Sequence, residues 1–164
     1  MGSGKSTLGK RLKTELGWDF LDLDDYFEER YQTTIKQYFA DFGEDAFREA
    51  EKKMLSEVIH KDKLIIATGG GTPCYFDNID TMNTNGLTIY IKLSVETIVG
   101  RLSGAKQVRP LVIGKTGDEL KSFISEKLLE REPFYSQAKV IADGDILGVE
   151  GFVRIIEASG KLVK

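Results

Sequence analysis

The sequence predicts an α/β fold in three layers, in which helices cover both faces of a parallel sheet. Short apolar runs alternate along the chain with longer segments whose apolar residues recur at helical spacing, and such runs between helices are typical of buried parallel strands. The length of 164 residues suits one compact domain, and no repeat, low-complexity tract or proline-rich linker divides it. We therefore expect a single domain over residues 1–164.

A phosphate-binding loop is predicted at the start of the chain. Residues 1–7 read MGSGKST, the second half of the pattern G-x-x-x-x-G-K-[ST]. In such a loop backbone N–H groups hold phosphate oxygens, Lys5 reaches the terminal phosphates and the hydroxyl of Ser6 helps to hold Mg²⁺. The alternative is a flexible glycine-rich terminus, but the leucines of residues 5–16 recur at helical spacing, so a helix begins at the lysine as a phosphate loop requires. The predicted nucleotide-binding residues are Gly2, Ser3, Gly4, Lys5, Ser6 and Thr7.

The remaining elements follow in order from the same patterns. Gly17 is a natural end for the first helix, and an extended segment is expected at 20–23. Apolar runs predict strands at 64–67, 88–92 and 140–142, and the first of these runs ends in a threonine and three glycines. Helical spacing predicts helices at 24–30, 34–39, 44–60, 95–102, 118–129 and 148–156.

Two segments depart from these regular patterns. The stretch 103–117 is rich in glycine and lysine, and its length and composition predict a mobile lid. Pro133 is expected to interrupt the last part of a helical run, because proline lacks the N–H group that a helix interior uses.

Composition argues against several classes of function. The net charge of −3 disfavours non-specific binding to nucleic acid. A single cysteine allows neither an internal disulfide nor a cysteine-based zinc site, and it suits a reducing compartment. No apolar stretch approaches the roughly 20 residues that cross a bilayer, and the N-terminus lacks a signal-peptide pattern. We therefore expect a cytoplasmic protein with no nucleic-acid or membrane partner.

Two carboxylates follow the first predicted strand. Asp22 and Asp24 are one residue apart, so on an extended backbone their side chains would point to the same side. One could hold Mg²⁺ through water while the other accepts a hydroxyl proton from the phosphate acceptor. The alternative is that Asp24 only caps the following helix, although Asp25 is the better candidate for the start of that helix.

Two arginines could clamp an anionic substrate, because a guanidinium group matches a carboxylate or phosphate with two hydrogen bonds. They are Arg48 on a predicted helix and Arg131 beside Pro133. The ordinary role of the first would be a solvated ion pair with Glu44, Asp45 or Glu51, which contributes little stability.

Two further features are candidates for ligand contact. Three glycines at 69–71 after a strand let the backbone approach a ligand and present N–H donors, whereas a turn usually needs only one glycine. Arg109, in the predicted lid, could move over the transferring phosphoryl group as charge spreads onto its oxygens. Its alternative is a merely solubilising surface charge.

The ordered set of motifs resembles the shikimate kinase family. The sequences MGSGKST, LDLD, FREAE, TGGG, RPL and REPFY occur in that family's order, and the resemblance spans nearly the whole chain. It implies a three-layer P-loop kinase fold with a parallel sheet of five strands. The implied reaction is that of ATP with shikimate to give ADP and shikimate 3-phosphate, a step towards chorismate and the aromatic amino acids. The implied cofactors are ATP and Mg²⁺, and a monomer is the expected state.

The resemblance also implies roles for residues on the nucleotide side. Lys5 and Ser6 would serve the phosphates and Mg²⁺, and Asp22 would support the metal. Arg109 would be the lid arginine near the ATP phosphates. Arg101 is similar to the family's adenine-stacking arginine.

On the acceptor side, the resemblance implies that Asp24 contacts the hydroxyl groups of shikimate and acts as the base. Arg48 and Arg131 would hold the shikimate carboxylate. Backbone groups of Gly70 and Gly71 would lie alongside.

The chain departs from the family pattern at its start. The first glycine of the loop pattern would lie two residues before Met1, and the strand that precedes the loop is missing too. In the family that strand is central, between the third and fourth strands of the sheet. Buried backbone groups without partners cost about 1–3 kcal/mol each, and a whole domain is stable by only about 5–15 kcal/mol. We therefore expect the chain as written to fold poorly and to bind ATP weakly.

Two other functions are open to such a chain. Another small P-loop kinase, for gluconate or a nucleoside monophosphate, would share the loop and the lid, but it would not be expected to combine LDLD, FREAE, TGGG and RPL. A truncated, non-catalytic relative would be expected to have lost Asp24 or one of the arginines, whereas this chain keeps them all.

Overall fold

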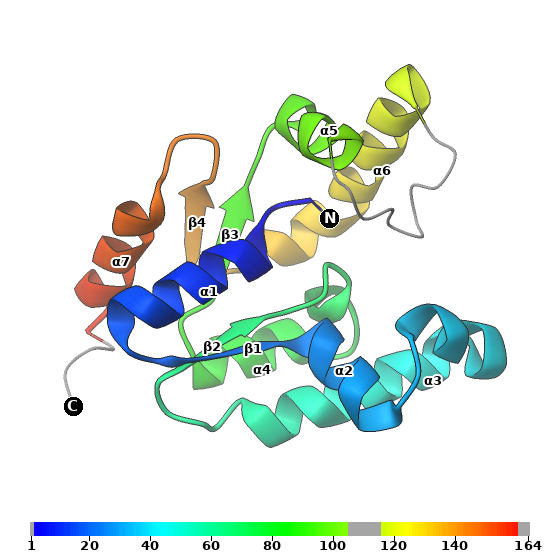
Figure 1. The fold of residues 1–164 in the computed structure, drawn as a ribbon, viewed down its shortest axis with the longest axis horizontal. Helices are drawn as coiled ribbons and strands as arrows, with labels where there is room; N and C mark the ends of the chain where they lie inside the picture. Colours follow the sequence, from blue (N-terminus) through cyan, green and yellow to red (C-terminus); the bar gives the residue numbers. More distant parts are fainter. Residues whose placement is uncertain (1, 105–115, 161–164) are drawn as a thin grey trace.

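Two separate pairs of parallel strands form the centre of the fold (Figure 1). The computed structural model describes residues 2–104 and 116–160. β1 (Asp19–Asp22) pairs with β2 (Leu64–Ala67), and β3 (Ile89–Lys92) pairs with β4 (Val140–Asp143). The strands predicted from apolar runs are therefore confirmed, with ends that differ by a residue.

Helices cover these strands and confirm most of the predicted segments. The first helix begins at Lys5 and ends before Gly17, whose φ of 65° suits glycine. The helices are α1 (Lys5–Leu16), α2 (Leu23–Tyr31), α3 (Ile35–Val58), η1 (Thr72–Cys74), α4 (Asn78–Asn85), α5 (Val95–Ser103), α6 (Gly117–Tyr135) and α7 (Val149–Ala158).

Gly43 separates the two helices predicted at 34–39 and 44–60. Its φ of 83° and ψ of 172° are not helical, so the range of α3 holds two helices with a break between them, as predicted. Two other parts of the helical prediction need correction. Pro133 does not interrupt α6, which continues to Tyr135. The last turn of α6 tolerates the N–H group that Pro133 lacks, because the backbone N–H of Ser136 closes this turn by donating to the carbonyl of Glu132. The short elements η1 and α4 were not predicted, because α4 reads NIDTMNTN and has little apolar periodicity.

Neighbouring residues of β2 show that helices lie on both faces of the strands. Ile65 packs with the cluster of α1 and α7, which includes Leu12 and Phe152. Leu64 and Ile66 pack instead with the cluster of α2 and α3. Because successive side chains of a strand point to opposite faces, these contacts establish the three predicted layers. None of the described helices combines the length and apolar character that a membrane span requires.

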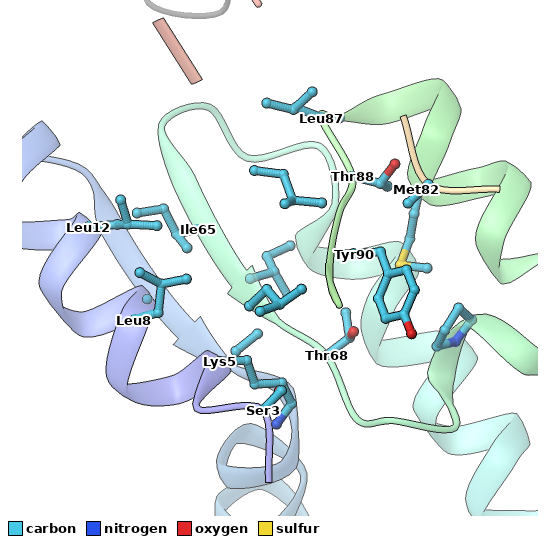
Figure 2. A pocket seen from close by; sticks show the side chains of 18 of the residues that line it. Ser3, Lys5, Leu8, Leu12, Ile65, Thr68, Met82, Leu87, Thr88 and Tyr90 are labelled. Atoms are coloured by element: carbon cyan, nitrogen blue, oxygen red, sulfur yellow. The ribbon is translucent and has the colours of Figure 1, made fainter. Parts of the chain in front are cut away.

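A cavity of about 440 Å³ lies between β2 and β3 (Figure 2). Its lining includes the consecutive residues 64–70 and 87–91, with Leu8 and Leu12 of α1 at one side. The volume is similar to that of many ligand pockets. However, a gap between the edges of two neighbouring strands would be lined in the same way, by consecutive residues of each strand. Among the described residues β2 pairs only with β1, and β3 only with β4. The cavity has the position that the resemblance assigns to the central strand.

Candidate functional site

The predicted phosphate loop leads directly into the N-terminus of α1. Gly2 and Gly4 have φ angles of 62° and 79°, which side chains rarely adopt, and this explains both glycines. Gly4 is the N-cap, no side chain caps the helix, and its first turn holds no acidic residue. The N–H groups of this turn and the positive end of the helix dipole therefore suit an anion such as phosphate. Lys5 and Ser6 begin the helix, as predicted.

Arg101 lies against this loop. Its Nη1 donates a hydrogen bond of 2.8 Å to the carbonyl of Ser3, and a Cβ at Gly2 would be 3.2 Å from Leu102 Cγ. α5 thus brings a cation to the backbone of the phosphate loop across almost a hundred residues of sequence. Arg109 and residues 105–115 of the predicted lid lie outside the described residues.

Asp22 joins the phosphate loop to the next strand. The hydroxyl of Ser6 donates to Asp22 Oδ2, and Asp22 is buried at the end of β1. Hydroxyl and carboxylate oxygens are the ligands that Mg²⁺ prefers, and a site with two of them leaves positions for phosphate oxygens and water. Within the described ranges no group of three or more His, Cys, Asp or Glu side chains could hold a metal ion alone. A metal ion here would therefore depend on the nucleotide as well.

Asp22, not Asp25, begins α2. Its Oδ1 accepts a hydrogen bond of 3.1 Å from the N–H of Asp24, which makes Asp22 the N-cap of a helix that starts at Leu23. The prediction that the side chains of Asp22 and Asp24 point to the same side of an extended backbone was therefore wrong, because β1 ends at Asp22 and Asp24 lies in the helix. The alternative role of Asp24 as the cap is wrong as well.

The carboxylate of Asp24 faces the glycine run. A Cβ built on Gly69 would lie 3.0 Å from Asp24 Oδ1 and 3.1 Å from Glu51 Oε1. Any side chain at Gly69 would therefore press on two carboxylates. This places the predicted base at the carboxyl end of β2, where ligand groups collect in parallel sheets.

Arg48 is held by two carboxylates. Its Nη1 donates to Glu51 at 2.9 Å, and its Nη2 donates to Glu44 at 2.9 Å. The predicted pairs with these two acids exist. The pair with Glu51 is buried, since Arg48 is 9% exposed and Glu51 is 2% exposed, whereas the Glu44 side chain is half exposed. Burial lowers the pKa of Arg48, but the facing carboxylates outweigh it and the pKa is raised. Arg48 is thus a fixed, charged group in a largely dry setting.

Gly71 makes room for that guanidinium group. A Cβ at Gly71 would be 2.6 Å from Nη2 and 2.8 Å from Nη1 of Arg48, far closer than real contacts. The prediction for the glycine run was close approach of backbone to a ligand. In the structure, the backbone at Gly71 comes close to the side chain of Arg48, the arginine that was predicted to bind the ligand.

Arg48 and Arg131 act on the same carboxylate. The pKa of Glu44 is lowered, first because the Tyr75 hydroxyl donates to it at 2.8 Å. The positive charges of Arg48 and Arg131 lower this pKa further. Glu44 is therefore hydrogen-bonded to Arg48 of α3 and is also affected by the charge of Arg131 of α6, the second arginine predicted for the anion clamp.

Three residues of this site were missed in the sequence. Thr72 donates to Glu51 Oε1 at 2.6 Å, so Glu51, already named as a possible partner of Arg48, has a partner for each oxygen. The ring of Tyr75 lies 4.2 Å from Arg48 Cζ. Tyr135 donates to the carbonyl of Gly70 at 2.6 Å. Helical spacing could have found Tyr135, four residues after Arg131, whereas no local pattern indicates Thr72 or Tyr75.

Comparison with known proteins gives one consistent result. The family model described as shikimate kinase matches residues 1–158. A shikimate kinase of Parabacteroides distasonis is 46% identical over 156 residues, which are 95% of this chain and 90% of the relative. A shikimate kinase of Bacteroides fragilis is 48% identical over 147 residues, which are 90% of this chain and 82% of the relative.

Solved structures agree with the sequence matches. The crystal structure of shikimate kinase from Bacteroides thetaiotaomicron superposes with a TM-score of 0.91 at 42% identity, covering 98% of this chain and 94% of that one. The enzyme from Acinetobacter baumannii in complex with shikimate superposes with a TM-score of 0.82 at 27% identity, covering 100% of this chain and 91% of that one.

Proposed function

This chain belongs to the shikimate kinase family, so its reaction is the transfer of a phosphoryl group from ATP to shikimate, and we propose that Asp24, Arg48 and Arg131 act on the acceptor. The observation that carries this proposal is the cluster at the carboxyl end of β2, where the Asp24 carboxylate lies at Gly69 and the Arg48 guanidinium group lies at Gly71. The positive charge of Arg131 also lowers the pKa of Glu44, the hydrogen-bond partner of Arg48. Groups arranged to hold one carboxylate can hold another in its place. The carboxylate of shikimate would then take over hydrogen bonds that Glu44 now receives.

Asp24 is the proposed general base. It would accept the proton of the attacking shikimate hydroxyl on a carboxylate oxygen as the oxygen–phosphorus bond forms. The contact geometry at Gly69 supports this role, because it puts Asp24 on the side of the glycine run where Arg48 also lies. Gly70 and Gly71 would contribute backbone groups beside the substrate carboxylate.

The nucleotide half of the proposal rests on α1 and its loop. Residues 2–7 would surround the phosphates of ATP, with Lys5 at the terminal ones. Ser6 and Asp22 would hold Mg²⁺, which neutralises charge on the phosphates when it is bound. Arg101, already hydrogen-bonded to the loop, would support the nucleotide. Arg109 is proposed as the lid arginine from the resemblance alone.

The wider setting is also a proposal. One domain with its own substrate site needs no partner subunit for the reaction, so we propose a monomer without nucleic-acid or membrane partners. Because ATP is supplied in the cytoplasm, we propose that the protein works there.

The proposed function is tested by ADP release with a panel of acceptors. We expect turnover with shikimate and none with gluconate or a nucleoside monophosphate. Arg131→Ala should raise the KM for shikimate at least about tenfold, since a charge-assisted bond is lost. Arg30→Ala is the matched control, because Arg30 pairs with Glu57 on the surface, and its KM should not change. Turnover with another acceptor alone would refute the substrate, and shikimate binding without turnover would favour a non-catalytic relative.

A further inference from the structure

The carbonyl groups of the glycine run point in different directions. The carbonyls of Gly69 and Gly71 accept from Thr72 and Cys74 within their own turn, at 3.2 and 2.8 Å. The carbonyl of Gly70 has a weak contact within the turn, from Cys74 Sγ at 3.9 Å, but its short hydrogen bond comes from outside, from the hydroxyl of Tyr135 at 2.6 Å. This bond crosses 65 residues of sequence and joins the loop after β2 to the last turn of α6.

A bond to the carbonyl of Gly70 also sets the direction of the next N–H group. The carbonyl of Gly70 and the N–H of Gly71 belong to one planar peptide, and none of the described peptide bonds is cis. In a trans peptide these two groups point in opposite directions, so the N–H of Gly71 points away from Tyr135. A peptide between two glycines rotates easily, because neither residue has a Cβ to restrict it. An outside contact is therefore needed to keep this plane in one orientation.

Tyr135 is well placed to supply that contact. Its ring lies 5.0 Å from the ring of Tyr90, whose own hydroxyl donates to Glu132 at 3.0 Å. Tyr135 follows Arg131 by one helical turn on α6, and helical residues four apart lie on one face. Tyr135 thus connects α6, the helix that carries Arg131, to Gly70, the residue before the glycine that makes room for Arg48.

We propose that Tyr135 is a positioning residue that locks the Gly70–Gly71 peptide, so that the N–H of Gly71 is held ready to donate to the substrate carboxylate between Arg48 and Arg131. The proposal rests on the proposed function of this site. Tyr135 touches neither substrate nor reacting atoms in this role. It acts through the orientation of one peptide plane, and its loss affects substrate binding more than the chemical step.

The test is Tyr135→Phe, which keeps the ring and removes only the hydroxyl. We expect the KM for shikimate to rise about tenfold, because the substrate must then pay for ordering the peptide. The kcat at saturating shikimate and the KM for ATP should stay within about twofold of wild type. Tyr90→Phe is the matched control, because it removes a hydroxyl from the adjoining ring without touching Gly70, and its KM for shikimate should stay within about twofold.

Three kinetic results would overturn the proposal: an unchanged KM for shikimate in Tyr135→Phe, an equal rise in both variants, or an equal loss in kcat and in ATP binding. A wild-type chain that does not phosphorylate shikimate would instead refute the proposed function, which keeps the two failures distinct.

A measurement on the wild-type chain does not depend on how the variant folds. With ¹⁵N-labelled glycine, the amide resonance of Gly71 should shift when shikimate is added, and by more than the resonance of Gly69. A Gly71 resonance that does not move at saturating shikimate would overturn the proposal.

Discussion

Replacement of Glu51 by alanine should remove the support of Arg48, the arginine proposed to bind the substrate, and a large part of the stability of the protein. Glu51 is 2% exposed, and its two oxygens accept from Arg48 at 2.9 Å and from Thr72 at 2.6 Å. Glu51→Ala leaves a buried guanidinium group with Glu44 as its remaining carboxylate, and leaves a buried hydroxyl without its acceptor. No water can reach these groups easily, since Thr72 is 0% exposed.

The expected loss follows from the burial of the pair. Removal of one partner from a buried ion pair costs about 3–5 kcal/mol. Glu44 is half exposed and still pairs with Arg48 in this variant, so the charge of Arg48 keeps one partner. The lower end of the range, about 3 kcal/mol, therefore applies to the loss of the ion pair with Glu51. The hydroxyl of Thr72 adds about 1 kcal/mol. A loss of about 4 kcal/mol is a large share of the about 5–15 kcal/mol that stabilises a domain.

The control is the same substitution on the same helix. Glu57 also lies on α3 and also pairs with an arginine, Arg30, but the two side chains are 35% and 38% exposed. Water and salt screen such a pair, so Glu57→Ala should cost about 0–1 kcal/mol.

The assay is equilibrium unfolding in urea at pH 7 for both variants and the wild-type chain. If Glu51→Ala costs no more than Glu57→Ala at an equal slope against urea, burial does not govern this ion pair and the reasoning is refuted. Should Glu51→Ala not fold, Glu51→Gln keeps the volume of the side chain and one of its two acceptor oxygens. It should then fold with a smaller loss than alanine would cause and with a raised KM for shikimate.

Three other outcomes are expected. Asp24→Asn should lower turnover by about 100-fold or more while the Kd for ATP in calorimetry stays within about twofold, and a turnover near that of wild type would rule out Asp24 as the base. Gly71→Ala should raise the KM for shikimate because its Cβ collides with Arg48, whereas Gly100→Ala, with nothing within 4 Å, should leave the KM unchanged. Burial raises the pKa of Glu51 above its ordinary value of 4.5, so folding takes up a proton there. The part of the stability that comes from this proton uptake is full below about pH 4.5 and is lost as the pH rises through the raised pKa. The difference in unfolding free energy between wild type and Glu51→Gln should therefore fall with rising pH, and a difference that grows would contradict the direction of the shift.

Local chemistry explains the parts of the fold and site that could be predicted. The start of α1 at Lys5 and the strand before the glycine run depend on short patterns of glycine and apolar residues, and both were confirmed. The start of α2 was predicted at residue 24, one residue late, because Asp22, Asp24 and Asp25 are all good caps by type. Only the end of β1 selects among them. The continuous path of α6 through Pro133 was missed for a similar reason, since the closing hydrogen bonds are a property of that particular turn.

By itself, the sequence determined the family, the reaction and the chemical groups proposed to serve it, because a phosphate loop and an ordered set of motifs require particular residue types at particular spacings. Only the tertiary structure decided what each group faces. Gly71 lies against Arg48, Ser6 donates to Asp22, and the carbonyl of Gly70 accepts from a tyrosine 65 residues away. Burial and distance between remote segments depend on how the helices pack on the strands, and no local pattern carries that information. For this reason the burial of Arg48 and its support by Glu51 became visible only in the folded chain.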